Sequence, residues 1–588
     1  TSWTNDNMRV RVVALGTDVS PHFYRIRLGI SFKLIVSVEG TLQDEDVLES
    51  LLPMYRLPAR ASNGEECLGL AQEWLHGCLK WHGSMCPPDQ TVELPTRVID
   101  VGLPSSSSPP KVIEPGGKQG KYLALSYCWG TAPFYNLTVD TMMEAMTSIP
   151  LSRLPATVRD AISLTRQLRI RYLWVDSLCI IQGQCSAARR DWEKESVKMA
   201  TVYGSAFLTI AATCSDSAHT GFFLKRPPFL KMQAMMRVRT SNPMNVILVL
   251  KLPWAYAHGS KGNDGPLARR GWAFQEKTLS PRTLFYGREG MSWKCQCTIH
   301  EEVLCTQVEI GANSVGPKAM YASWPEHVTE YSARRLTVIS DRLRAIEGIA
   351  QSIRTEVNVE YLSGIWKDQL LPQLMWKHIE AGRSGFRISY DDHDCSFPSW
   401  SWASVSGAVK FLPLIPDNPP VIHGASPMFI YLSAPVEEVG AILHLSSASY
   451  GIFEPEFGLP VELRTHIDDV EAIPLSHIAS FHPEVVNRII NVAFMYLDSD
   501  KGLVLLKYKS TAPEQKVDAP AVMRKQFLEH HTPRLIHKWP WISSKQNASP
   551  TAKACPEVLP WVTYQRIGIF ENMSSNRPNV KRSKVILI

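Results

Sequence analysis

Continuous apolar runs alternate with helix-spaced apolar stripes in the first half of the chain. Residues 122–127, 172–181 and 206–212 are runs that consist almost entirely of apolar side chains. Such runs are typical of strands that are covered on both faces of a sheet. Residues 155–168 instead repeat apolar side chains at helical spacing, and Asp191 is positioned to cap a second helix. The pattern therefore predicts strand, helix, strand, helix, strand.

This order of elements indicates an α/β fold with a wound, mainly parallel sheet. Ligands of such sheets bind at the carboxyl ends of the strands. Trp129 and Gly130 follow the first predicted strand, and Asp176 follows the apolar residues 172–175 of the second. These three residues are therefore candidates for ligand contacts.

The flanking sequence predicts further elements. Residues 68–81 carry an apolar stripe at helical spacing, and residues 94–101 predict a strand. Residues 104–120 are rich in Ser, Pro and Gly and predict a loop or linker. Amphipathic patterns predict helices over residues 331–350 and 361–376.

Later in the chain, apolar segments near residues 442–446, 494–506 and 564–570 predict strands. The expected organisation has five parts: an N-terminal segment without assignment (1–66), a helix and strand with a Ser/Pro/Gly-rich linker (67–120), the wound α/β domain (121–300), a helical flank (301–395) and a β-rich C-terminal region (396–588).

Composition and charge exclude several classes of protein. With 588 residues, 45% of them hydrophobic and 20% charged, the chain is too long for a single core and is ordinary for a globular protein. The net charge of +6 is too small for this length to indicate nucleic-acid binding. No apolar stretch is long enough to span a membrane, and most of the 12 cysteines lie in hydrophobic runs, as buried reduced thiols do. We expect a cytoplasmic protein.

Residues 268–287 contain the strongest candidate for chemistry, the carboxylate of Glu276. It stands one helical turn after Trp272 and directly after Gln275, and Arg270 precedes them. Residues four apart share a helix face, so Trp272 and Glu276 are expected on one surface. An aromatic plane beside an acid is suited to a ligand that carries a ring.

Three blocks of sequence, residues 122–130, 154–182 and 268–287, resemble in this order the HET (heterokaryon incompatibility) domain of filamentous fungi. The resemblance covers roughly residues 70–410 and is strongest over residues 122–287. It implies a protein of fungal innate immunity that acts in non-self recognition and triggers programmed cell death. It also implies homotypic self-association and a protein trigger.

HET domains are in turn similar to TIR domains, which implies a TIR/flavodoxin-like sheet. Catalytic TIR domains carry a Trp, a Cys, two variable residues and then the catalytic Glu. The chain keeps this spacing with Trp272 and Glu276 but has Ala273 in place of the Cys. The resemblance implies that Glu276 cleaves NAD+, which is then a substrate and not a cofactor. A fixed carboxylate would stabilise the positive charge that develops on ribose when nicotinamide leaves.

The residues expected to contact NAD+ are Trp129, Gly130, Asp176, Arg270, Trp272 and Gln275. Each of the main candidates also has a structural interpretation. Glu276 can pair with Arg270 or cap the backbone near Ser280, and Asp176 can close a turn with Ser177. Trp129 can belong to the core.

Two groups of cysteine and histidine invite comparison with metal sites. Cys78, His82 and Cys86 follow one another at four-residue steps, and Cys295 and Cys297 lie near His300 and Cys305. Neither group supplies four ligands at a standard spacing. We therefore assign no metal, favour buried thiols, and leave metal binding by either group open.

Two functional hypotheses follow. In the first, the α/β domain is an enzyme that cleaves NAD+ through Glu276. In the second, it is a non-enzymatic scaffold that transmits a signal through contacts between HET domains. A pocket that contains Glu276, Trp129 and Asp176 together would favour the enzyme.

Overall fold

The computed structural model of the chain describes residues 2–5, 8–11, 23–27, 31–39, 59, 61–103, 108–226, 233–238, 245–251, 265–288, 290–302, 308–311, 316–379, 397–414, 419–444, 451–455, 463–467, 487–497, 501–507, 562–572 and 582–587. The chain divides into two compact units. The first comprises Thr1–Ser323 and Arg334–Val357, and the second comprises Trp324–Ala333 and Asn358–Ile588. The domain boundaries expected from the sequence stay predictions.

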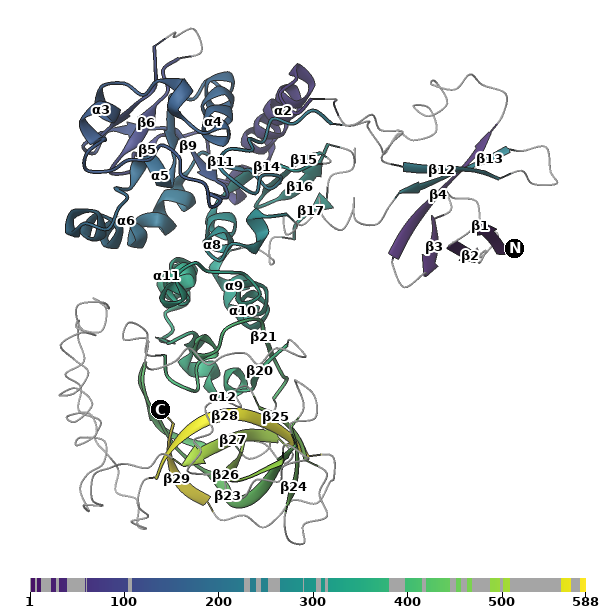
Figure 1. The fold of residues 1–588 in the computed structure, drawn as a ribbon, viewed down its shortest axis with the longest axis vertical. Helices are drawn as coiled ribbons and strands as arrows, with labels where there is room; N and C mark the ends of the chain where they lie inside the picture. The colour runs from purple at the N-terminus through teal and green to yellow at the C-terminus, as the bar shows by residue number, and fades with distance from the viewer. Residues whose placement is uncertain are drawn as a thin grey trace. The chain divides into compact units, whose positions relative to one another are not determined.

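A nine-stranded sheet lies in the first unit (Figure 1). Its strands are β6 (Val98–Asp100), β7 (Lys111–Ile113), β9 (Tyr122–Ser126), β10 (Tyr172–Trp174), β11 (Leu208–Ala211), β14 (Arg282–Tyr286), β15 (Met291–Cys295), β16 (Thr298–Glu301) and β17 (Val308–Glu309). Their order is β17-β16-β15-β14-β11-β9-β10-β6-β7. The four central strands, β14, β11, β9 and β10, are parallel, and the outer strands pair antiparallel. The prediction of a parallel sheet holds for this centre, and the complete sheet is mixed.

Helices connect and flank the strands. In the first unit they include α2 (Glu65–Trp81), α3 (Met142–Thr147), α4 (Ala156–Gln167), α5 (Asp176–Cys179), α6 (Ser186–Ser205), α8 (Trp272–Leu279), α9 (Pro317–Ala322) and α11 (Arg344–Val357). Helix α4 packs on β10, and α8 packs on both α6 and α11. The class is therefore α/β, as predicted.

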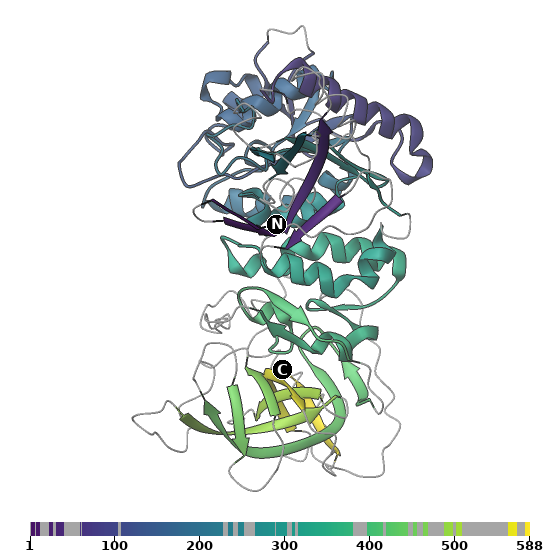
Figure 2. The same cartoon turned by 90° about the vertical axis from the view of Figure 1, so that its right-hand side faces the viewer.

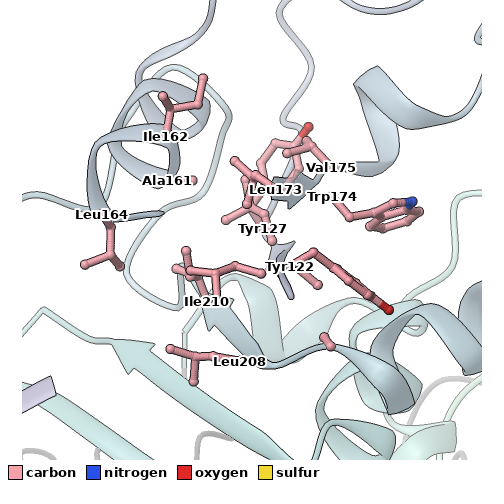
Figure 3. Close-up of a cluster of buried hydrophobic side chains, with 14 of the residues drawn as sticks. Tyr122, Tyr127, Ala161, Ile162, Leu164, Leu173, Trp174, Val175, Leu208 and Ile210 are labelled. Atoms are coloured by element: carbon pink, nitrogen blue, oxygen red, sulfur yellow. The ribbon is translucent and has the colours of Figure 1, made fainter. Parts of the chain in front are cut away.

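The core of this unit is built from the predicted apolar runs. Apolar side chains from α4, β9, β10 and β11 belong to one buried cluster (Figure 3). All five residues of β9 and all four of β11 are buried, so these strands need apolar side chains on both faces. The predicted strands near residues 122–127 and 206–212 and the helix near 155–168 are confirmed.

The apolar run at residues 172–181 is not one strand. Strand β10 ends at Trp174, and the short helix α5 begins at Asp176, whose carboxylate accepts a hydrogen bond from the N–H of Ser177 (2.7 Å). Leu178 and Cys179 are buried from a helix instead. The prediction was wrong because the periodicity of a short apolar run does not separate a buried strand from a buried helix.

Asp191 does not cap a helix. Helix α6 begins earlier, at Ser186, with Cys185 as its N-cap. The Asp191 carboxylate instead accepts hydrogen bonds from the guanidinium of Arg97 (2.6 Å) and from the N–H of Ile181 (2.8 Å). Because Arg97 is buried, this ion pair compensates a charge inside the protein.

The predicted loop at residues 104–120 contains sheet residues. Strand β7 pairs with β6 and extends the sheet, and β8 (Gln119–Gly120) pairs with β5 (Val92–Glu93). The expected strand at residues 94–101 is confirmed in its second half, as β6. The helix predicted at residues 68–81 is confirmed as α2.

Two helices predicted beyond residue 330 are confirmed only in part. The pattern at residues 331–350 is divided between α10 (Trp324–Ser332) and α11. Residues 361–376 form the hairpin β18 (Tyr361–Leu362) and β19 (Ile365–Trp366) and then the short α12 (Leu370–Leu374).

A tight turn and two indoles fix that hairpin. Ser363 and Gly364 have positive φ angles of 44° and 105°, which suits a two-residue hairpin turn. The carbonyl of Gly364 accepts the indole N–H of Trp324 (2.9 Å) and of Trp402 (2.8 Å). Two tryptophans that are distant in sequence therefore fix this turn, and local periodicity does not predict such a contact.

The second unit also contains an eight-stranded sheet (Figure 2). Its strands are β22 (Val421–Ala425), β23 (Ile430–His444), β24 (Gly451–Pro455), β25 (Leu463–Ile467), β26 (Asn487–Tyr496), β27 (Lys501–Lys507), β28 (Val562–Asn572) and β29 (Arg582–Leu587). Strand β26 pairs with both β27 and β23, so the pairings close on themselves. The first unit contains a further, four-stranded sheet, whose strands are β3 (Phe23–Arg27), β4 (Ser31–Glu39), β12 (Gln233–Val238) and β13 (Asn245–Lys251). Among the described residues, no helix is long and apolar enough to cross a membrane.

Candidate active site

Glu276 lies in α8 and points to the end of β9. Its side chain is 3% exposed, and its Oε2 atom accepts a hydrogen bond from the hydroxyl of Ser126, the last residue of β9. The backbone carbonyl of Glu276 accepts the hydroxyl of Ser280 (2.6 Å). The helix thus fixes the carboxylate against the carboxyl end of a central parallel strand.

Burial controls the ionisation of this carboxyl group. It raises the pKa of Glu276 from its ordinary 4.5 to about 7, because the charged form loses its hydration. The charge of Arg270 and the hydrogen bond from Ser126 act in the opposite direction, while the charge of Asp176 raises the pKa further. A carboxyl group that titrates near neutral pH is a candidate for function on physical grounds.

Asp176 and Trp129 form the second part of the site. The indole N–H of Trp129 donates to Oδ2 of Asp176 (3.0 Å), and the N–H of Ser177 donates to Oδ1 (2.7 Å). Trp129 therefore extends from the loop after β9 to the first residue of α5. Burial raises the pKa of Asp176, and the charge of Arg270 opposes this shift.

Arg270 is the cation of the site. Its guanidinium donates to the backbone carbonyl of Tyr127, just beyond β9, and its charge lowers the pKa of both Glu276 and Asp176. The Tyr127 hydroxyl continues the network by donating to the hydroxyl of Ser177 (2.8 Å). We call Glu276, Asp176 and Arg270, with Ser126 and Trp129, the acid–base cluster.

Gly130 has a backbone reason for being glycine. Its φ angle is +76°, and a Cβ atom would lie 2.5 Å from Cβ of Ser217. The N–H of Ala218 also donates to the carbonyl of Trp129 (3.1 Å). Gly130 is exposed, and its contacts hold the loop after β9 against residues 217–218.

Trp272 and Gln275 have partners on other elements. The indole N–H of Trp272 points to Oδ2 of Asp341 (3.4 Å), and the amide oxygen of Gln275 accepts the N–H of Gly348 in α11 (2.8 Å). Glu276, Asp176, Arg270 and Trp129 are thus brought together, whereas Trp272 and Gln275 take part in contacts between α8 and the segment that contains α11.

A narrow pocket adjoins Ser126. Residues of β9, β11, β14 and α8 line it, among them Ser126, Thr209, Thr283 and Lys277. It has room for about one water molecule. Glu276, Trp129 and Asp176 are not among its lining residues, so the pocket reaches the acid–base cluster only through Ser126.

Ser126 has a larger part in this site than the sequence pattern indicated, because the pattern favoured Trp129 and Gly130 over it. It is a buried polar side chain, 4% exposed, at the last position of an otherwise apolar strand. That contrast is a usable signal, because a buried hydroxyl requires a partner. The partner, Glu276, lies 150 residues later in the chain.

Fold and site together define an α/β domain with an acid–base cluster, centred on the buried Glu276, at the carboxyl ends of its central strands. Residues 122–276 match the family model described as Heterokaryon incompatibility protein (HET). The chain therefore carries a HET domain, as the sequence resemblance indicated. The matched segment begins at the first residue of β9 and ends at Glu276. Searches of curated proteins and of solved structures found no match.

Proposed function

We propose that the protein acts in fungal non-self recognition and that its HET domain triggers programmed cell death by cleaving NAD+, with Glu276 as the catalytic carboxylate. The observation that carries this proposal is the position of Glu276, buried against Ser126 at the carboxyl end of β9 beside Arg270 and Asp176. An upstream protein would act as the trigger, and self-association would activate the domain.

Strand order supports the choice of site. In chain order the parallel strands β9, β10, β11 and β14 are strands 1 to 4, and in space they follow the order 2-1-3-4. This is the beginning of the flavodoxin-like order, in which ligands bind where the winding reverses, next to the first strand. Ser126 ends β9 and Trp129 follows it, and the narrow pocket extends from Ser126 across residues of β11 and β14.

The chemistry requires an ionised carboxylate. The bond between the nicotinamide nitrogen and C1′ of ribose breaks, nicotinamide leaves with the electron pair, and positive charge develops on the sugar. Ionised Glu276 would stabilise that charge until water adds to C1′ and releases a proton. With a pKa of about 7, Glu276 is partly ionised at neutral pH, and Arg270 favours the ionised form. Trp129 and Asp176 would contact the nicotinamide ring and a ribose hydroxyl.

Substrate access requires an opening. A space for about one water molecule does not admit a nicotinamide ring. The proposal therefore includes a movement of α8 away from β9 when HET domains associate. Cleavage should then rise more steeply than linearly with protein concentration.

A non-enzymatic scaffold is the second candidate. It is favoured by the same burial, because Glu276 is 3% exposed and already accepts a hydrogen bond from Ser126. In this case the acid–base cluster only fixes α8 on the sheet, and the domain signals through homotypic contacts. Loss of Glu276 would then affect stability and not NAD+.

The test is nicotinamide release from NAD+ by the purified full chain, over a range of protein concentrations. Glu276→Gln should abolish release while the protein stays folded. Glu195→Gln is the matched control, since Glu195 is also buried (4% exposed) but lies on α6 with Lys198 and Thr96 as partners. Equal release by wild type and Glu276→Gln would eliminate Glu276 as the catalytic group. Self-association without any release would favour the scaffold.

A further inference from the structure

The two cysteine and histidine groups of the sequence meet in space. Cys78, His82 and Cys86 come from the end of α2 and the turn behind it, and Cys295 is the last residue of β15. Their ligand atoms all lie within 4.8 Å of one another. Nδ1 of His82 is 3.3 Å from Sγ of Cys295 and 3.6 Å from Sγ of Cys86. We call these four residues the thiol–imidazole cluster.

We propose that the thiol–imidazole cluster is a structural zinc site with three cysteine ligands and one histidine ligand. Three sulfurs and one imidazole nitrogen are a standard ligand set for structural Zn²⁺. In a tetrahedral site with zinc–sulfur bonds of about 2.3 Å, neighbouring ligand atoms are about 3.5–3.8 Å apart. The two separations at Nδ1 of His82, 3.3 and 3.6 Å, are close to this range, and none of the others exceeds 4.8 Å.

Local backbone structure explains how α2 presents three ligands. Cys78 lies in the last turn, and α2 ends with His82 as its C-cap, whose N–H points to the carbonyl of Cys78 (3.4 Å). A short 3-10 turn, Gly83–Met85, begins with a glycine at φ +50° and returns the chain so that Cys86 faces the helix end. Pro87 follows this turn, so the helix is not resumed after Cys86.

The surroundings suit thiolates bound to a metal. Three thiolates and one Zn²⁺ carry a net charge of −1, and the buried guanidinium of Arg282 donates through Nε to Sγ of Cys78 (3.2 Å). The N–H of Thr298 donates to Sγ of Cys295 (3.4 Å). Donors of this kind orient ligands and stabilise their negative charge. Cys78, Cys86 and Cys295 are each at most 3% exposed, as a closed structural site requires.

Cys297 is the neighbour that tests the assignment. Its Sγ lies 3.7 Å from Sγ of Cys86, but it does not belong to the set of four. It is also more exposed than Cys295. Cys295→Ser and Cys297→Ser are therefore a matched pair, two residues apart and with the same chemical change.

The site would extend the folding unit of the HET domain. The family match covers residues 122–276, whereas the four ligands lie before and after it. A zinc ion would connect α2 to β15, which contact each other, and would do so across more than 200 residues of sequence. This role does not depend on whether the domain cleaves NAD+.

The experiment is the metal content of the purified full chain, measured by mass spectrometry after dialysis without added metal. Wild type and Cys297→Ser should each hold one zinc per chain, and Cys295→Ser should hold almost none. His82→Cys should keep zinc through four thiolates, while His82→Ala should lose it. After exchange for Co²⁺, wild type should show the visible absorption of a tetrahedral thiolate site.

Several results would overturn the proposal. They are a wild-type chain without zinc, zinc that mild dialysis removes as an adventitious ion only, and zinc that Cys295→Ser retains. Loss in Cys297→Ser but not in Cys295→Ser would refute the ligand assignment, as would a disulfide between Cys86 and Cys297. If Cys295→Ser does not fold, the wild-type stoichiometry and the contrast between His82→Cys and His82→Ala decide the question.

Discussion

The first unit holds two polar clusters, each built around buried side chains, that differ in how their charges are balanced. The acid–base cluster contains positive and negative charges, because Arg270 lies near Glu276 and Asp176. The thiol–imidazole cluster brings together four groups that bind cations. Opposite charges that already meet can either be a structural network or perform chemistry. Converging thiols and an imidazole instead call for an ion from outside the chain. The comparison indicates that the residues of the acid–base cluster are candidates for catalysis, whereas those of the thiol–imidazole cluster are candidates for a structural metal site.

The largest expected effect is that of metal removal. A strong zinc chelator should lower the free energy of unfolding of the wild-type chain by on the order of 5 kcal/mol, because metal binding contributes directly to folding. Thermal unfolding with and without chelator measures the effect, and added zinc should reverse it. Cys295→Ser should not respond to the chelator. If the chelator does not change the melting temperature of the wild-type chain, the thiol–imidazole cluster, like the acid–base cluster, is stable without a metal ion.

Arg270→Met should come next, because it leaves two carboxylates in the acid–base cluster without their cation. We expect a loss of about 2–4 kcal/mol in the free energy of unfolding at pH 8. The loss should be smaller at pH 5, where Glu276 is protonated. Arg269→Met is the matched control, since Arg269 is exposed and should change stability little. An equal loss in the free energy of unfolding for both variants would show that Arg270 does not stabilise the two carboxylates.

The pH dependence of stability should identify Glu276 itself. Its folded pKa of about 7 lies above the ordinary 4.5, so the folded state binds the proton more tightly than the unfolded state. This contribution is complete below about pH 4.5 and is lost as the pH rises through about 7. Wild type should therefore lose about 2 kcal/mol more between pH 5 and pH 8 than Glu276→Gln, since one pKa unit corresponds to about 1.4 kcal/mol. Parallel pH profiles would contradict this assignment.

An effect similar in size to the pH effect concerns the packing behind Glu276. A Cβ atom on Gly348 would lie 2.4 Å from Cβ of Ala200 and 2.6 Å from the amide oxygen of Gln275. Gly348→Ala should cost about 1–3 kcal/mol through overpacking between α11 and its neighbours. Gly69→Ala, in α2 and with no atom within 4 Å of its added Cβ, is the control and should not destabilise. Denaturant unfolding of both variants measures the difference.

Part of this account could be predicted from the sequence. The buried strands β9 and β11 and the helix α4 follow from apolar runs and stripes, and strand ends located Trp129 and Asp176. Helix α5 could not be predicted, because four apolar or small residues after Asp176 suit a strand or a helix equally. The amphipathic pattern at residues 361–376 suggested a helix, but Trp324 and Trp402, which lie outside this range, donate their indole N–H groups to the turn carbonyl of Gly364, which is a tertiary contact.

In both clusters the sequence revealed some members, while the remaining partners come from distant parts of the chain. Trp272 and Glu276 suggested a shared surface by spacing, yet Trp272 is bonded to Asp341, and Glu276 to Ser126 from another strand. The three ligands near residue 82 were visible as a pattern that lacked a fourth member. His82 and Cys295 are 213 residues apart, and the packing of α2 against β15 brings them together. Local spacing in the sequence identifies part of each cluster, and the packing of distant elements supplies the remaining residues.

The central claim is that Glu276 cleaves NAD+, and the most direct measurement is the rate of nicotinamide release by the full chain as a function of pH. The account predicts a rate that rises with pH through about 7, as Glu276 ionises, and that disappears in Glu276→Gln but persists in Glu195→Gln. Release by Glu276→Gln at the wild-type rate, or no release by folded wild type at any concentration or pH, would contradict it.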